Sequence, residues 1–177
     1  MPSTTATEEK KALRRAMRER IRADHGPLLE EFLSLEQVKG AKALLVFYGV
    51  GNEPDTRGLI LALLEAGKKV ALPRCLAGGE MEARWVTGLA GLVPNRFGIP
   101  EPGEDCPPAR REELDVILVP NLCCDREGYR LGHGGGYYDR YLAGYGGFTV
   151  ALCPREWLAD RLPREEHDRR VDRVVTG

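Results

Sequence analysis

Two short apolar segments with an amphipathic segment between them limit the architectures open to this chain. Residues 43–48 (ALLVFY) are a nearly continuous apolar run, which predicts a strand buried on both faces. Residues 54–66 have the periodicity of a helix that ends at Gly67, and residues 69–72 predict the next strand. A strand, a helix and a strand in this order predict a right-handed crossover between parallel strands.

The same alternation continues along the rest of the chain. Residues 1–7 predict a flexible tail and residues 121–136 a long polar loop. The other predicted elements are helices at 8–23, from 28 to about 37, at 137–142 and after Pro154, strands around 85, at 115–119, 148–152 and 170–175, and an extended excursion at 88–112. No internal repeat is visible, so we expect a single catalytic domain over residues 1–177. Its predicted class is α/β: one three-layer domain with an open, largely parallel sheet and helices on both faces.

Composition and charge narrow the classes of function. With 42% hydrophobic residues and a net charge of -1, the chain can bury a core but has no overall field that attracts nucleic acid. No apolar run is long enough to span a membrane, and no N-terminal stretch resembles a signal peptide. The five cysteines are odd in number and lack C-x-x-C spacing, which favours free thiols. We therefore expect a cytoplasmic protein without a nucleic-acid, membrane or obligate protein partner.

The segment at 130–139 (RLGHGGGYYD) carries the strongest functional signal. Residues 132–136, here called the glycine loop, lie between a predicted strand and a predicted helix. Glycine adopts positive φ, and the free N–H groups of such a loop, next to a helix N-terminus, form an anion site that suits a polyphosphate. The loop lacks the Lys-Ser/Thr of a Walker A motif, and Tyr137 stands where a dinucleotide fingerprint needs a small residue. A tight loop without a ligand is the alternative.

Charged residues elsewhere have a functional and a structural interpretation each. Asp139, in the first turn of the predicted helix, is either a Mg²⁺ ligand or a charge that complements the helix dipole. Lys10, Arg14 and Arg18 form a basic stripe on one helix face, which is either solvated or a phosphate clamp. Glu53 follows a buried strand, where ligands of α/β sheets bind, and either reads a polar substrate or caps a helix.

Nucleophilic catalysis finds no support in the residue pattern. The three histidines show no metal-ligand spacing, and His133 alone lies within a candidate site, where it donates to phosphate or faces solvent. No Ser/His/Asp or Cys/His arrangement can be argued, so no covalent nucleophile is expected.

These segments, in this order, resemble the 5-formyltetrahydrofolate cyclo-ligase family over most of the chain. Residues 10–14 resemble its Lys-x-x-Leu-Arg motif, and residues 98–102 its Ile-Pro-x-Pro stretch. The most specific match lies at 115–141, which includes the glycine loop, and residues 168–172 resemble its closing Asp-x-x-Val-Asp segment. A sugar-phosphate isomerase, a CoA-transferase relative and a non-catalytic nucleotide-binding module stay open as alternatives.

The resemblance implies an ATP-dependent ring closure of 5-formyltetrahydrofolate to 5,10-methenyltetrahydrofolate, with ATP as co-substrate and Mg²⁺ as cofactor. Carried over by position, the implied ATP-binding residues are Lys10, Lys11, Arg14, Arg130, Leu131, Gly132, His133, Gly134, Gly135, Gly136, Tyr137, Tyr138 and Asp139. The implied folate-binding residues are Tyr48, Glu53, Arg14, Gly134, Gly135, Gly136, Tyr137 and Tyr138, and the implied Mg²⁺ ligands are Asp139 and Asp172.

Overall fold

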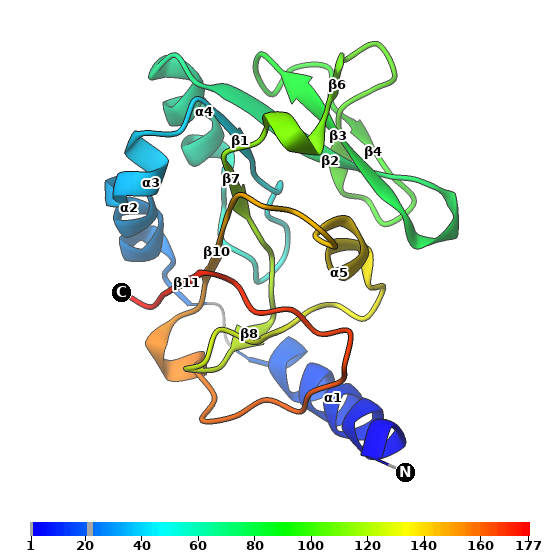
Figure 1. Cartoon of the computed structure of the whole chain (residues 1–177). Helices are drawn as coiled ribbons and strands as arrows, with labels where there is room; N and C mark the ends of the chain where they lie inside the picture. The colour runs from blue at the N-terminus through cyan, green and yellow to red at the C-terminus, as the bar shows by residue number, and fades with distance from the viewer. Residues whose placement is uncertain (1, 21–22) are drawn as a thin grey trace.

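The computed structural model describes residues 2–20 and 23–177, which build one central seven-stranded sheet (Figure 1). The sheet has the order β11-β10-β7-β1-β2-β3-β6. Its strands are β1 (Ala43–Leu45), β2 (Lys69–Cys75), β3 (Met81–Val86), β6 (Pro108–Ala109), β7 (Val116–Leu118), β10 (Phe148–Leu152) and β11 (Arg173–Val175). β1, β2, β7, β10 and β11 run parallel, whereas β3 and β6 pair antiparallel at one edge. The predicted largely parallel sheet is confirmed.

The predicted crossover is present at the centre of this sheet. Helix α4 (Arg57–Glu65) connects β1 to β2, whose register pairs Leu44 with Val70. Leu44 and Leu45 are fully buried but belong to cores on opposite faces, because successive side chains of a strand alternate. A strand covered on both faces explains why the sequence here is a continuous apolar run.

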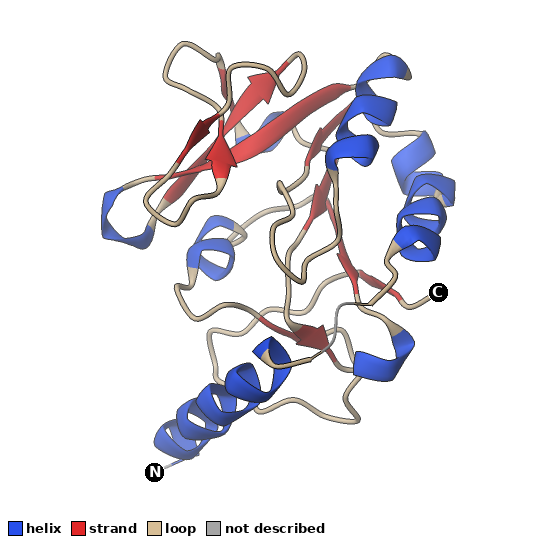
Figure 2. Cartoon of the chain, turned by 180° about the vertical axis from the view of Figure 1, so that it is seen from behind, coloured by secondary structure: helices blue, strands red, loops and turns tan. Residues whose placement is uncertain are grey.

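Helices cover both faces of the sheet, as predicted (Figure 2). On one face, α2 (Gly26–Ser34), α3 (Glu36–Lys39) and α4 share a core in which Phe32 and Ile60 are fully buried. On the other face, α5 (Tyr137–Tyr141) and Met17 of α1 (Pro2–Arg18) contribute to a second core around Ile117. The class is therefore α/β. Among the described residues, no helix is long and apolar enough to cross a membrane.

The N-terminal prediction was wrong in its boundaries. Residues 2–7, predicted to be a tail, form the first turns of α1, in which Ala6 is buried. The Ser/Thr-rich sequence carries no apolar stripe, so periodicity could not detect these turns. The helix ends at Arg18 and not near 23, and residues 21 and 22 of the predicted helix lie outside the described residues.

The segment at 121–136 is partly structured, where a continuous loop was expected. β8 (Cys123–Cys124) and β9 (Arg130–Leu131) form a hairpin around Asp125, which is fully buried. One Asp125 oxygen accepts hydrogen bonds from the backbone N–H of Glu127 and Tyr129 and closes the turn. The remaining short elements are β4 (Val93–Pro94), β5 (Pro100–Glu101), and the 3-10 turns η1 (Ala77–Gly79), η2 (Arg111–Glu113) and η3 (Arg155–Trp157).

Candidate active site

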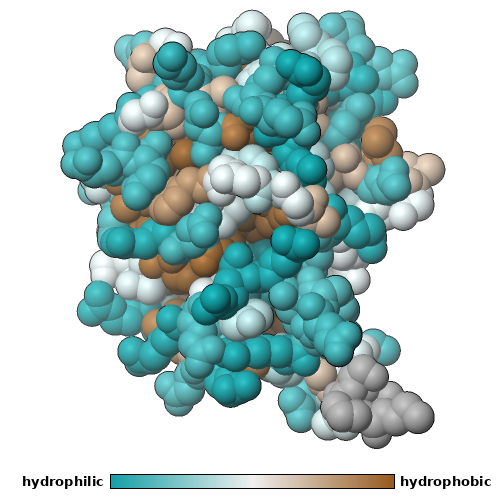
Figure 3. All heavy atoms as spheres, viewed as in Figure 1, coloured by the Kyte–Doolittle hydropathy of each residue, from teal (hydrophilic) through white to brown (hydrophobic). Residues whose placement is uncertain are grey.

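A cleft of about 890 Å³ lies beyond the carboxyl ends of β1, β2 and β7. Segments far apart in the sequence line it: α1, the loop after β1, the β4–β5 hairpin, the glycine loop and residues 165–168. On the side of the molecule seen in Figure 1, Figure 3 shows apolar patches among a mostly polar surface. Its volume is at the upper end of the range for small-molecule sites, which suits a large ligand or two smaller ones.

The glycine loop forms one wall of the cleft and connects β9 to α5. All five of its residues line the cleft, as do Leu131 and Tyr137 on either side. Gly134 and Gly136 have φ of 108° and 72°, which side chains rarely adopt, and Gly136 is the N-terminal cap of α5. Two glycines of the loop therefore have the positive φ that the sequence predicts.

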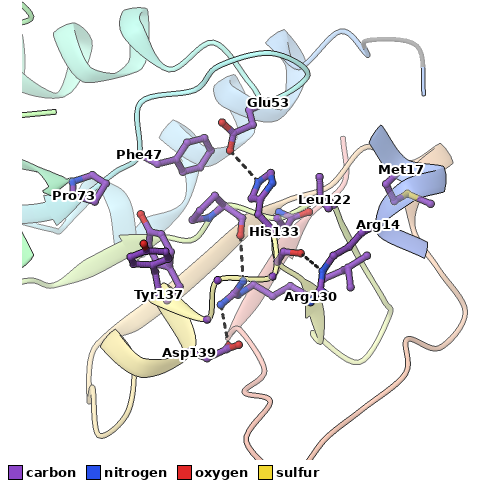
Figure 4. Close-up of a pocket in the computed structure, with 18 of the residues that line it drawn as sticks. Arg14, Met17, Phe47, Glu53, Pro73, Leu122, Arg130, His133, Tyr137 and Asp139 are labelled. Atoms are coloured by element: carbon purple, nitrogen blue, oxygen red, sulfur yellow. Dashed lines mark hydrogen bonds and ion pairs between the residues drawn. The ribbon is translucent and has the colours of Figure 1, made fainter. Parts of the chain in front are cut away.

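The basic stripe of α1 faces the cleft and the glycine loop, and its side chains range from buried Lys10 to exposed Arg18. The Arg14 Nε donates to the Gly132 carbonyl at 2.9 Å (Figure 4). The Arg18 Nη2 donates to the His133 carbonyl at 3.1 Å. Lys11, in contrast, is exposed and lies outside the described cleft lining. One helix face thus brings two guanidinium groups to the loop.

Lys10 lies on the same face and is buried, with 7% of its surface exposed. Its Nζ lies 3.0 Å from Glu165 Oε1 and 2.5 Å from Asp168 Oδ2. Burying an ammonium group is tolerable because two carboxylates surround it. These two ion pairs connect α1 to residues 165–168 of the C-terminal segment.

Asp139 lies at the floor of the cleft and is held by Arg130. The Arg130 Nη2 donates to Asp139 Oδ1 at 3.0 Å, and the Arg130 side chain is 5% exposed. Asp139, His167 and Asp168 each offer a ligand atom, and these atoms lie within 4.8 Å of one another. Two carboxylates and an imidazole at this spacing fit a divalent cation.

Asp172, the second expected metal ligand, does not lie with this group. It is exposed outside the cleft lining, and its Oδ2 accepts hydrogen bonds from the Thr149 N–H and hydroxyl at 2.9 and 3.1 Å. The structure therefore places Asp168, four residues earlier, beside Asp139. Asp168 precedes the predicted strand at 170–175 and Asp172 lies within it, and the sequence does not show which of the two faces the cleft.

Glu53 lies at the opposite wall and is 14% exposed at its side chain. One oxygen accepts the Val50 N–H at 3.1 Å, and the other lies 3.5 Å from His133 Nε2 (Figure 4). Thr56, which is fully buried, bonds the backbone of Phe47 and Gly49 at the start of α4. The N-cap position of α4 is occupied by Thr56 and not by Glu53, and one Glu53 oxygen faces the glycine loop.

Tyrosines form the wall between Glu53 and Asp139. The Tyr138 hydroxyl is buried and, among the described residues, has no hydrogen-bond partner. Burial and, second, the charge of Glu53 raise the pKa of Tyr138 well above its usual value, so the phenol stays protonated and can donate. The Tyr137 hydroxyl accepts a hydrogen bond from Arg96 at 3.2 Å, and Tyr48 also lines the cleft.

Several lining residues were not anticipated from the sequence. Phe97, at the turn between β4 and β5, is 59% exposed and borders the cleft. Its segment was predicted only as an extended excursion, because its two strands have two residues each. A phenylalanine between Arg96 and Gly98, within a segment rich in Gly, Pro and charge, is the sequence signal that could have identified it.

Comparisons with known proteins agree with one another. A model of the 5-formyltetrahydrofolate cyclo-ligase family matches residues 6–177. A 5-formyltetrahydrofolate cyclo-ligase of Mycolicibacterium smegmatis is 36% identical over 92% of this chain and 87% of its own length, and that of Mus musculus is 29% identical over 99% and 97%. The solved structure of the Aquifex aeolicus 5,10-methenyltetrahydrofolate synthetase, 31% identical, matches with a TM-score of 0.81 over 97% of this chain and 89% of its own.

Proposed function

The chain belongs to the 5-formyltetrahydrofolate cyclo-ligase family, and on that premise we propose that its cleft holds ATP and 5-formyltetrahydrofolate side by side. The observation that carries this assignment is that a surface suited to phosphate and a surface suited to a pterin face each other across one cleft. The glycine loop with Arg14 and Arg18 suits phosphate, and Glu53 lies on the facing wall, 3.5 Å from His133 of the same loop. A phosphate bound at the loop is thus adjacent to a ligand bound at Glu53.

The triphosphate of ATP would bind at the glycine loop. Its glycines expose backbone N–H groups at the N-terminus of α5, which favours negative charge. Arg14 and Arg18 bond loop carbonyls from the cleft side, so both guanidinium groups already lie at the phosphate position. Lys10 belongs to the same basic face, whereas the exposed Lys11 has no direct part in this arrangement.

The pterin ring of the folate would bind at Glu53. A reduced pterin presents adjacent N–H donors, and a carboxylate accepts two of them through charge-assisted hydrogen bonds. The rings of Phe47, Tyr48 and Tyr137 line the same end of the cleft and offer apolar surface to a flat heterocycle. The Tyr138 hydroxyl, which has no hydrogen-bond partner among residues 2–20 and 23–177, adds a neutral donor.

Mg²⁺ would be held by Asp139 and Asp168, with His167 beside them. This assignment replaces the expected pair of Asp139 and Asp172, because Asp172 bonds Thr149 outside the cleft. Mg²⁺ is usually bound by one or two carboxylates together with phosphate oxygens, and it would neutralise charge on the triphosphate here. Lys10 now pairs with Asp168 and is the natural group to exchange that partner for a phosphate.

The reaction that this arrangement supports needs positioning and charge neutralisation more than covalent catalysis. The formyl oxygen attacks the γ-phosphorus, and the bond from that phosphorus to ADP breaks. N10 then attacks the formyl carbon and loses its proton, and the carbon–oxygen bond breaks to release phosphate and 5,10-methenyltetrahydrofolate. The arginines of α1 would stabilise the phosphate charge in both steps.

We further infer that the enzyme acts in the cytoplasm on small molecules, with no nucleic acid or obligate protein partner. All five cysteines are free, and Cys123, Cys124 and Cys153 are buried, which suits a reducing compartment.

The experiment that tests the function is incubation of the purified chain with 5-formyltetrahydrofolate and Mg-ATP. We expect equimolar ADP and a methenyl product, which absorbs in the near ultraviolet. ADP release without that absorbance would indicate a nucleotide-binding or ATPase protein and would refute the proposal.

A further inference from the structure

Arg140 contacts the glycine loop from outside the cleft, and we propose that it is a positioning residue for ATP binding. The proposal rests on the assignment of the glycine loop to phosphate. Arg140 lies in α5, one residue beyond the family motif that ends at Asp139. Among the described residues that line the cleft, Gly135 and Gly136 are present and Arg140 is not.

The guanidinium group of Arg140 joins two backbone carbonyls. Its Nε and Nη2 donate to the Gly79 carbonyl at 2.9 and 2.8 Å, and its Nη2 also donates to the Gly135 carbonyl. Gly79 belongs to η1, the connection between β2 and β3. A planar guanidinium makes such paired bonds with little loss of freedom, and an ammonium cannot reproduce the geometry.

Holding the Gly135 carbonyl determines the direction of the next N–H group. In a trans peptide the C=O and the N–H point in opposite directions. Because Arg140 holds the Gly135 oxygen on the outer side of the loop, the Gly136 N–H points toward the cleft. That N–H lies at the N-terminus of α5, where a phosphate oxygen would accept it.

Two glycines leave room for this guanidinium. Gly79 has a φ of 76°, and a Cβ at that position would lie 2.2 Å from Arg140 Nη2. A Cβ at Gly136 would lie 2.8 Å from Arg140 Nη1. The two segments that Arg140 joins are 57 residues apart by number (136 minus 79), and both lack side chains where it passes.

The division of labour among the loop arginines follows from their positions. Arg14 and Arg18 bond the Gly132 and His133 carbonyls from within the cleft, where ATP would compete for them. Arg140 lies behind the loop and keeps its bonds during binding. A loop rich in glycine loses more conformational entropy on ordering than other sequences, so a fixed contact lowers the cost of binding phosphate.

The test compares Arg140→Ala with Arg111→Ala. Arg111 is a matched control, because its Nη1 donates to the Tyr141 and Ala143 carbonyls at 2.8 and 2.5 Å, at the other end of α5. We expect Arg140→Ala to raise the KM for ATP about tenfold and the KM for 5-formyltetrahydrofolate less than about twofold. Arg111→Ala should lower the Tm and leave both KM values unchanged. Equal ATP effects of the two variants would overturn the proposal.

Arg140→Lys separates positioning from charge. We expect its ATP KM to stay at least about threefold above wild type in low and in high salt, since one ammonium cannot bond both carbonyls as the guanidinium does. Complete recovery would mean that only the positive charge matters and would overturn the proposal. This variant keeps the charge and a long side chain, so it also serves if Arg140→Ala does not fold.

Gly79→Ala tests the contact from the other side. Its methyl group would displace the guanidinium, so its effect on ATP affinity should largely vanish in the Arg140→Ala background. Additive effects would show that Gly79 acts independently of Arg140 and would contradict the proposal. Calorimetric ATP affinity of all variants is measured without folate. These ATP affinities still test the role of Arg140 if the wild-type protein forms no methenyl product. Lack of that product would refute the proposed function but not the role of Arg140 in ATP binding.

Discussion

At the scale of single residues, Glu53 separates a folate enzyme from a general ATP-binding protein. Glu53→Gln keeps the shape but removes the charge and replaces one acceptor by a donor. The expected loss is about 1.5–3 kcal/mol, the range for a hydrogen bond to a charged group, or roughly tenfold to a hundredfold in kcat/KM for 5-formyltetrahydrofolate. ATP affinity should barely change, because we assign its phosphates to the glycine loop and not to Glu53.

Asp55→Asn is the control for Glu53→Gln. Asp55 is a nearby acid whose carboxylate pairs with Arg57 on the surface, so its loss should leave folate kinetics unchanged. If Glu53→Gln weakens ATP binding as much as folate binding, or weakens neither, then Glu53 does not bind the pterin. Its role would then be limited to the turn in which it accepts the Val50 N–H.

Arg14 and Arg15 are neighbours in sequence but differ by about 100° around α1. Arg14 bonds the glycine loop, whereas Arg15 is exposed. Arg14→Ala should raise the KM for ATP about tenfold, as expected when a charged hydrogen-bond donor is lost, and Arg15→Ala should change it less than about twofold. Steady-state kinetics at varied ATP concentration measure both KM values. Equal effects of the two variants would indicate that the basic residues of α1 attract ATP through their overall charge and not through a direct contact by Arg14.

Asp168 and Asp172 give a similar pair for the metal. Asp168→Asn should raise the Mg²⁺ concentration for half-maximal activity about tenfold, since one carboxylate beside Asp139 is lost. Asp172→Asn should instead lower the Tm, because Asp172 bonds the Thr149 N–H and hydroxyl and joins β11 to β10. A larger shift in Mg²⁺ dependence for Asp172→Asn would restore the original expectation.

At the scale of elements, we expect ATP binding by the glycine loop to depend on the backbone conformation at Gly134 and Gly136 and on the space at Gly135. Gly134 and Gly136 have positive φ, whereas Gly135 does not, and a Cβ at Gly135 would lie 2.7 Å from the Tyr137 ring. Gly134→Ala should therefore weaken ATP binding by straining the backbone, with a cost of about 1–3 kcal/mol. Gly135→Val should weaken it through contact with the Tyr137 ring.

Gly58→Ala is the control for the loop variants. Gly58 lies in α4, and a Cβ there meets nothing within 4 Å, so alanine should leave ATP affinity unchanged and stabilise the helix by up to about 1 kcal/mol. Calorimetry with ATP and a melting curve measure both quantities. Wild-type ATP affinity in Gly134→Ala would mean that the loop does not bind phosphate.

The elements with a strong local pattern were the ones that the sequence predicted. The apolar runs at 43–48 and 148–152 predicted strands, and they contain β1 (Ala43–Leu45) and β10 (Phe148–Leu152). The two-residue strands of the Cys123 hairpin were too short to produce a pattern. The hairpin exists because the buried carboxylate of Asp125 satisfies N–H groups of its turn, a tertiary fact that periodicity does not contain.

At the scale of the whole molecule, the cleft is assembled from both ends of the chain. Lys10 and Asp168 are 158 residues apart in the sequence and lie in contact. The glycine loop, from the part of the chain between them, lines the same cleft. The glycine loop, Glu53 and the basic face, which the sequence predicted as candidate sites, all line the cleft. The sequence could not show that Asp168 and not Asp172 lies beside Asp139. That choice depends on how residues 165–168 pack against α1.

The central claim is that this cleft activates the formyl oxygen by phosphorylation. The most direct test is turnover of 5-formyltetrahydrofolate that carries ¹⁸O in the formyl group, with Mg-ATP, followed by mass spectrometry of the released inorganic phosphate. The account predicts that each methenyl product formed leaves one ¹⁸O atom in phosphate, because the oxygen departs attached to the former γ-phosphorus. Unlabelled phosphate, with the ¹⁸O recovered in water, would contradict it.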